Sequence, residues 1–130
     1  MTIANWCVLA ACILPILTVG LAKGGSAKSA ASAGKYDNNN PRDWANRLTG
    51  WQMRANAAQG NGFEALPLFI AAVVLAQQSQ ADQGRIDMLA LIFIALRLVY
   101  IAVYLMNLGT LRTLVWTASM AASIAILVMS

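Results

Sequence analysis

The segment from Leu89 to Leu111 constrains the fold of this chain more than any other part of the sequence. It is apolar almost throughout, with the sequence LALIFIALRLVYIAVYLMNLGTL. In an α-helix, about 20 residues at about 1.5 Å rise per residue cross the hydrocarbon core of a bilayer. We therefore predict that this segment forms a membrane-spanning helix with Arg97 near its centre.

Arg97 is the unusual residue of this helix because its guanidinium stays charged. On insertion scales, an arginine near the middle of a spanning helix costs about 2.5 to 3.5 kcal/mol, so the side chain must face protein, water or an anion. At about 100° per residue, Tyr100 and Tyr104 share a helix face with Arg97. Two interpretations stay open: a buried arginine that ties helices together, and an anion pocket lined by phenols.

The composition indicates an integral membrane protein. Of the 130 residues, 59% are hydrophobic and only 11% are charged, and the apolar residues fall in blocks long enough to cross a bilayer. We predict an all-α fold, a bundle of four transmembrane helices in a single domain over residues 1–130. The expected helices cover residues 3–22, 43–78, 86–106 and 110–129, and the expected loop covers residues 23–42.

The basic residues predict the orientation of the bundle. Most of the nine lysines and arginines lie between the first two apolar blocks. The turn before the Arg97 helix instead carries Arg85 against Asp82 and Asp87. By the positive-inside rule we expect residues 23–42 in the cytoplasm and both termini outside. The net charge of +4 thus has a topological explanation, and no basic helix interleaved with aromatic residues indicates nucleic-acid binding.

A second polar face is expected on the helix over residues 43–78. Its fully apolar part, residues 65–76, is too short to span a membrane alone, so the helix must extend toward Asn61 and Glu64. A carboxylate at the membrane edge is costly unless it is paired. Arg54 falls on the same face. The simplest alternative for this face is a network of hydrogen bonds between helices.

Small residues and proline indicate where helices approach closely. We expect the first helix to be kinked or packed at Pro15, and Gly60 and Gly62 to admit a neighbour or a ligand. Ser119 and Ser123 form a stripe on the last helix that suits tight packing.

The cysteines do not indicate a metal site. Cys7 and Cys12 lie about 140° apart around the first helix, and the chain has no histidine. A disulfide between them would be strained, so we interpret both as packing residues.

Five short motifs, spread over nearly the whole chain, are shared with one known family. They are Asn40-Pro41-Arg42, Arg54-Ala55, Asn61-x-x-Glu64-Ala65-x-Pro67-x-Phe69, Arg97-x-x-Tyr100-x-x-x-Tyr104-Leu105 and Arg112-Thr113. In this combination the chain resembles the MAPEG family, the membrane-associated proteins in eicosanoid and glutathione metabolism. It is most similar to the small bacterial members, which implies a location in the bacterial inner membrane.

The resemblance implies a homotrimer that holds glutathione, as a co-substrate, between neighbouring subunits near the cytoplasmic face. On the helix over residues 43–78, Asn61 and Glu64 would hold the polar groups of the peptide, with Glu64 facing its amino group. Arg54 belongs to the same motif region and counts as a ligand-binding residue.

The last two motifs supply the thiol side of the implied site. Arg97, Tyr104 and Arg112 would match ligand and thiol-side positions of the family, and Tyr100 belongs to the same motif. Thr113 stands where some members place a serine proposed to assist the thiol. We take Arg112, Tyr104 and Thr113 as the candidate catalytic residues, and Arg97 and Tyr100 as binding residues.

The resemblance implies a glutathione-dependent transferase or peroxidase that activates a thiol toward apolar electrophiles or lipid hydroperoxides. Many members carry histidine and further arginines where this chain has Ala57, Gln59 and Gly60. The alternative is a non-catalytic protein with the same fold, which binds lipid or serves as an accessory subunit of a larger membrane complex. Expected partners are other copies of the chain and membrane lipids.

Overall fold

The computed structural model describes residues 1–28 and 34–130, and of the residues from 25 to 28 it gives the backbone alone. Over the described residues the chain is helical. The helices are α1 (Ile3–Lys28), α2 (Pro41–Asn46), α3 (Gly50–Gln78), α4 (Gln83–Leu105) and α5 (Gly109–Leu127). Four of them, all except the short α2, are long and apolar enough to cross a membrane. The prediction of an all-α bundle with four spanning helices is therefore confirmed.

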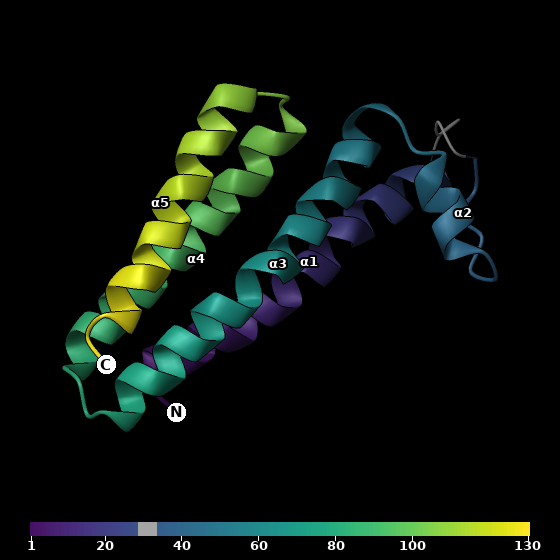
Figure 1. Cartoon of the computed structure of the whole chain (residues 1–130). Coiled ribbons are helices and arrows are strands. Elements are labelled where there is room, and N and C mark those ends of the chain that lie inside the picture. Colours follow the sequence, from purple (N-terminus) through teal and green to yellow (C-terminus); the bar gives the residue numbers. More distant parts are fainter. Residues whose placement is uncertain (29–33) are drawn as a thin grey trace.

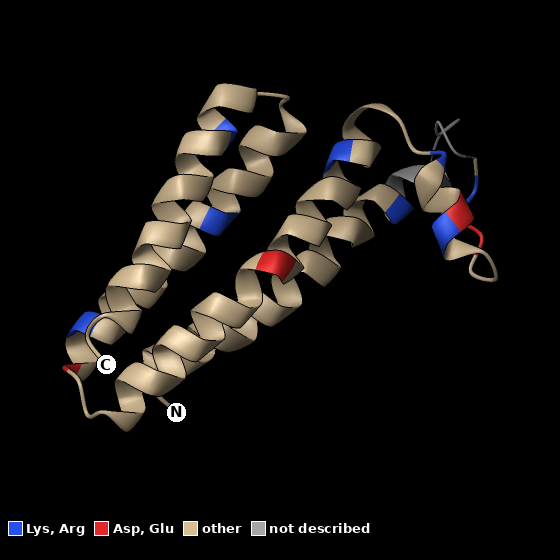
Figure 2. Cartoon of the chain, viewed as in Figure 1, with Lys and Arg blue, Asp and Glu red and all other residues tan. Residues whose placement is uncertain are grey.

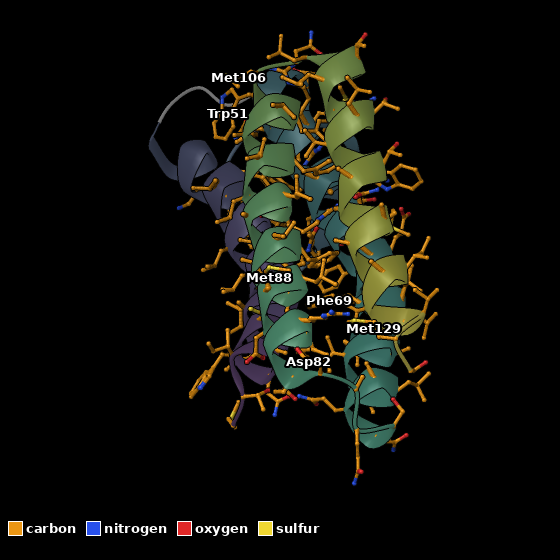
Figure 3. All side chains as sticks on the ribbon, turned by 90° about the vertical axis from the view of Figure 1, so that its left-hand side faces the viewer. Trp51, Phe69, Asp82, Met88, Met106 and Met129 are labelled. Carbon is orange, nitrogen blue, oxygen red and sulfur yellow. The ribbon has the colours of Figure 1, made fainter. Side chains whose placement is uncertain are left out.

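The helices form two antiparallel pairs, α1 with α3 and α4 with α5 (Figure 1). Both termini lie at the end of the bundle that carries the turn between α3 and α4. Helix α2 and the turn between α4 and α5 lie at the opposite end. Figure 3 shows the same polarity, with Trp51 and Met106 at one end and Asp82 and Met129 at the other. Most Lys and Arg residues gather at the α2 end (Figure 2), which we call the basic end.

The helix expected over residues 43–78 is divided in the structure. Helix α2 ends at Asn46, and α3 begins at Gly50, whose φ of 61° is accessible to glycine at little cost. Trp44 and Leu48, on either side of the α2 terminus, are both buried against Ala22 and Ala55. The break therefore lies between two side chains that are buried in one cluster.

The ends of the other helices also differ from the expected bounds. Helix α1 continues to Lys28 instead of ending at residue 22. Helix α4 begins at Gln83 because the Asp82 carboxylate accepts a hydrogen bond from the Arg85 amide over 2.8 Å. It ends before Asn107, which has a φ of 62°, a left-handed conformation typical of the residue after a helix. Asn107 thus terminates the helix.

Close packing joins the two pairs. Phe69 of α3 and Phe93 of α4 stack with ring centroids 3.9 Å apart, and both are buried (Figure 3 labels Phe69). Within the first pair, a Cβ atom on Gly62 of α3 would lie 2.8 Å from Cγ of Pro15 in α1. Pro15 is therefore packed against α3, and Gly62 provides the close approach that the sequence predicted. Gly60 faces open space instead.

The end with the two termini is held together by polar side chains. The Asp87 carboxylate accepts a hydrogen bond from the Ala4 amide over 2.8 Å and another from the Gln83 side chain over 2.7 Å. Because the first amides of a helix have no partner within it, Asp87 of α4 caps α1. The Gln77 amide group donates to Thr2 over 3.0 Å.

The serine stripe of α5 is buried, as predicted. Ser119 and Ser123 are both inaccessible to solvent. The Ser119 hydroxyl donates to the Trp116 carbonyl over 2.8 Å. Cys7 is buried in the core near the start of α1, Cys12 is half-buried, and both are free thiols.

Candidate functional site

Arg97 is buried within the bundle, with 4% of its side chain exposed. Its Nη2 atom donates a hydrogen bond to Asn61 Oδ1 over 2.8 Å, which joins α4 to α3. Its guanidinium carbon lies 4.3 Å from the centroid of the Tyr100 ring, within the range of a cation–π interaction. The remaining Nη1 atom is buried and has no hydrogen-bond partner among the described residues. The guanidinium therefore has unused capacity to bind an acceptor.

Arg112 forms a second cation and ring pair beside the first. It lies in the first turn of α5, and its guanidinium carbon is 4.4 Å from the centroid of the Tyr104 ring. Tyr104 and Tyr100, four residues apart on α4, meet edge to face with centroids 5.6 Å apart. The two arginines are thus held on one face of α4 by two touching phenol rings.

A pocket of about 150 Å³ opens beside these residues. It is lined by Asn61, Tyr100, Arg112, Thr113 and Trp116. Among the described residues that line it there is no carboxylate, and Arg112 carries the one formal charge. A phenol, a carboxamide and a guanidinium carry hydrogen-bond donors for an anion or a polarisable sulfur.

Thr113 and Trp116 both line this pocket. Thr113 is exposed, and its hydroxyl donates to the Gly109 carbonyl over 3.2 Å. Its oxygen remains able to accept a hydrogen bond. Trp116 follows Arg112 by one helical turn, which places it on the same stripe of α5. Its position in the pocket wall adds a residue that the sequence analysis did not assign to the site. The spacing of four residues between Arg112 and Trp116 was the sequence signal that could have assigned Trp116 to the site.

Arg54 and Glu64 lie apart from the pocket wall. Arg54 Nε donates to the Leu105 carbonyl over 3.1 Å, so this arginine covers an unpaired carbonyl at the end of α4. Glu64 is exposed near the middle of α3, where Figure 2 shows acidic colour within a spanning helix. Among the described residues Glu64 has no hydrogen bond or ion pair. Of the eight predicted site residues, the structure brings six together: Asn61, Arg97, Tyr100, Tyr104, Arg112 and Thr113.

These features define a class of protein, namely a four-span helical membrane protein with an open pocket lined by an arginine and a tyrosine. The model of the MAPEG family matches residues 3–130, essentially the whole chain. The protein therefore belongs to the MAPEG family. No curated protein and no solved structure matches the chain.

Proposed function

We propose that this protein is a membrane-bound, glutathione-dependent transferase or peroxidase. It activates the glutathione thiol toward apolar electrophiles or lipid hydroperoxides that arrive from the bilayer. The observation that carries the proposal is the pocket lined by Arg112, Tyr100 and Asn61, with no carboxylate among its described lining residues. A second guanidinium, that of Arg97, lies behind it and contacts both Tyr100 and Asn61. Membership of the MAPEG family supports the choice of thiol.

The chemistry required of the site is stabilisation of a thiolate. A free thiol has a pKa of about 8.5 and is mostly protonated at neutral pH. Lowering that pKa by about two units corresponds to about 2.7 kcal/mol, which one close guanidinium can supply in a partly dry site. Arg112 is the candidate because it lines the pocket at the first turn of α5, where unpaired backbone amides also favour an anion.

The remaining groups position the peptide. The Asn61 carboxamide lines the pocket and is oriented by Arg97. Within the described part of the chain Arg54 donates through its Nε atom alone, to Leu105, which leaves its terminal nitrogens for a carboxylate. Glu64 would pair with the ammonium of the ligand.

Glu64 also supports the proposed assembly. An exposed carboxylate within a spanning helix is costly in lipid. A neighbouring protomer that covers this face of α3 removes that cost. We therefore infer a homotrimer in which α3 of one protomer and the pocket of the next enclose the ligand, as the family resemblance implies.

Two reactions follow from the same thiolate. With an electrophile, the sulfur forms a bond to carbon, and the leaving group departs with the bonding electron pair. With a hydroperoxide, the sulfur attacks the terminal oxygen, the O–O bond breaks, and the alkoxide takes a proton to become an alcohol. A second glutathione then reduces the resulting sulfenic acid, which yields glutathione disulfide and water. Tyr104 would donate a hydrogen bond to the thiolate before attack.

The test is a difference absorbance titration of the purified protein with glutathione, in the ultraviolet band where a thiolate absorbs and a thiol does not. We expect a saturable signal that Arg112→Gln abolishes. Arg85→Gln is the matched control, because Arg85 is exposed at the other end of the bundle. No signal at millimolar glutathione from a folded oligomer would overturn the proposal in favour of a non-catalytic lipid-binding or accessory subunit.

We further infer that the basic end faces the cytoplasm of a bacterial inner membrane, with both termini outside. The concentration of Lys and Arg residues at that end supports this orientation (Figure 2). Reporter fusions to the N-terminus that are active only outside the membrane would test it.

A further inference from the structure

A second hollow lies on the opposite side of α3 from the arginine pocket. It has a volume of about 320 Å³ and lies between α1, α2 and α3. Among the described residues, its wall contains two cations, Lys23 and Arg42, two carboxamides, Asn56 and Gln59, and no carboxylate. We call it the basic pocket. At about 100° per residue, Asn56 and Gln59 fall about 140° and 160° around α3 from Asn61, so the two pockets are separate.

The cations of the basic pocket are available to a ligand. The Lys23 Nζ atom lies 4.4 Å from the centroid of the Tyr36 ring, which itself packs edge to face on Trp44 at 4.9 Å. This contact fixes the ammonium at the pocket wall without neutralising it. Arg42 is exposed, and within the described part of the chain it forms no ion pair. The pocket thus keeps its positive charge.

The carboxamides are available as well. Neither Asn56 nor Gln59 makes a hydrogen bond to another described residue, although both are half-buried. Their amide groups are therefore free to donate to an acceptor. Two cations and two amide donors around one hollow match the several acceptor oxygens of a phosphate group.

The position of the pocket indicates how such a phosphate would arrive. Val19 in its wall belongs to the candidate spanning segment Ile3–Gly24, and Lys23 lies in the last turn of that segment. The hollow therefore lies at the membrane boundary, with an apolar side and a charged side. Ile16 is an exposed apolar residue of α1, and it falls about 60° from Val19 around the helix. An acyl chain can lie along this surface.

We propose that the basic pocket binds the phosphate of an anionic phospholipid, with the acyl chains along the exposed surface of α1. A soluble phosphate would make the same contacts with the cations and amides, but it has no acyl chain to pack against the apolar surface of α1. The proposal concerns a different face of α3 from the thiol site and does not depend on the proposed function.

Native mass spectrometry of the detergent-purified protein tests the proposal. Phosphatidylglycerol, phosphatidylcholine and inorganic phosphate are added in separate titrations. Because each basic residue near a lipid surface favours anionic lipid, we expect about a tenfold preference for phosphatidylglycerol over phosphatidylcholine. We expect Lys23→Gln combined with Arg42→Gln to reduce that preference to about twofold or less.

Arg47→Gln is the matched control, because Arg47 is an exposed arginine at the same end that does not line the pocket. An equal loss of preference in Arg47→Gln would overturn the proposal by showing diffuse surface attraction. Equal binding of the two lipids by the unchanged protein would also overturn it. Retention of inorganic phosphate at the same concentrations would assign the pocket to a soluble anion instead. Arg42→Gln alone guards against misfolding, since it alters an exposed side chain, and its oligomer mass should match that of the unchanged protein.

Discussion

Arg97 of α4 donates a hydrogen bond to Asn61 of α3 over 2.8 Å, and this is the one hydrogen bond that its guanidinium makes within the described residues. The substitution Asn61→Ala would leave the buried guanidinium of Arg97 without a hydrogen bond to any described residue. Removing a hydrogen bond to a charged group costs about 1.5 to 3 kcal/mol. We expect a loss of this size in the free energy of unfolding, measured by denaturant or thermal unfolding of the solubilised protein.

Asn56→Ala is the control for this measurement. Asn56 lies on the same helix, and its side chain makes no hydrogen bond to the described residues. The same substitution there should change the stability by about 0.5 kcal/mol or less. If both variants lose equal stability, the contact between Arg97 and Asn61 does not stabilise the bundle.

The contact between Gly62 and Pro15 gives a prediction about packing. An added Cβ atom on Gly62 would lie 2.8 Å from Pro15 Cγ and 3.3 Å from Pro15 Cβ. Overpacking of this kind costs about 1 to 3 kcal/mol, so Gly62→Ala should lower the melting temperature. Gly60→Ala adds the same atom into open space and should raise stability by about 0.5 to 1 kcal/mol through helix propensity. The idea fails if Gly62→Ala is as stable as Gly60→Ala.

The number and type of the spanning helices could be predicted because length and apolarity alone determine which segments cross a bilayer. The break between α2 and α3 could not. Trp44 and Leu48 continue the apolar pattern of a helix, and the sequence pattern does not reveal that both pack in one cluster with Ala22, a residue of a different helix. Contacts between helices are not encoded in the periodicity of either one.

The same limit applies to the candidate site. The face shared by Arg97, Tyr100 and Tyr104 follows from the helical repeat, and the structure confirms it. The partner of Arg97 depends on which helix packs beside α4, as does the bond from Arg54 to the Leu105 carbonyl. The roles of these residues in binding and catalysis stay predictions.

Asp37, which lies outside the spanning helices, predicts that the stability of its turn depends on pH. Its carboxylate accepts hydrogen bonds from the Asn40 side chain over 3.0 Å and the Asn39 amide over 2.9 Å, and these bonds hold its pKa below the usual value. A lowered folded-state pKa adds stability above the unfolded-state pKa, and that stability is lost as the pH falls through the folded-state pKa. We therefore expect the turn over residues 37–40 to loosen below about pH 4, near the ordinary aspartate pKa.

Hydrogen exchange of a peptide that covers this turn would measure the effect. Asp37→Asn provides the control, because its side chain cannot titrate. Protection in the unchanged protein should converge on that of Asp37→Asn as the pH falls. Equal protection at neutral pH would contradict the role of the carboxylate.

Tyr104 offers two distinct contributions to the thiol site, a ring under Arg112 and a phenol hydroxyl. Tyr104→Phe keeps the ring at 4.4 Å from the guanidinium and removes the O–H group. Loss of one hydrogen bond, which contributes about 0.5 to 1.5 kcal/mol, should raise the pKa of the bound glutathione thiol by about one unit or less. Tyr104→Leu also removes the ring that positions Arg112. The pKa of the glutathione thiol bound to this variant should therefore approach the pKa found with Arg112→Gln. The measurement is the pH dependence of the thiolate absorbance, with Tyr36→Phe as the control. If Tyr104→Leu shifts the pKa no further than Tyr104→Phe, the ring does not position the arginine, and the hydroxyl alone accounts for the contribution of this residue.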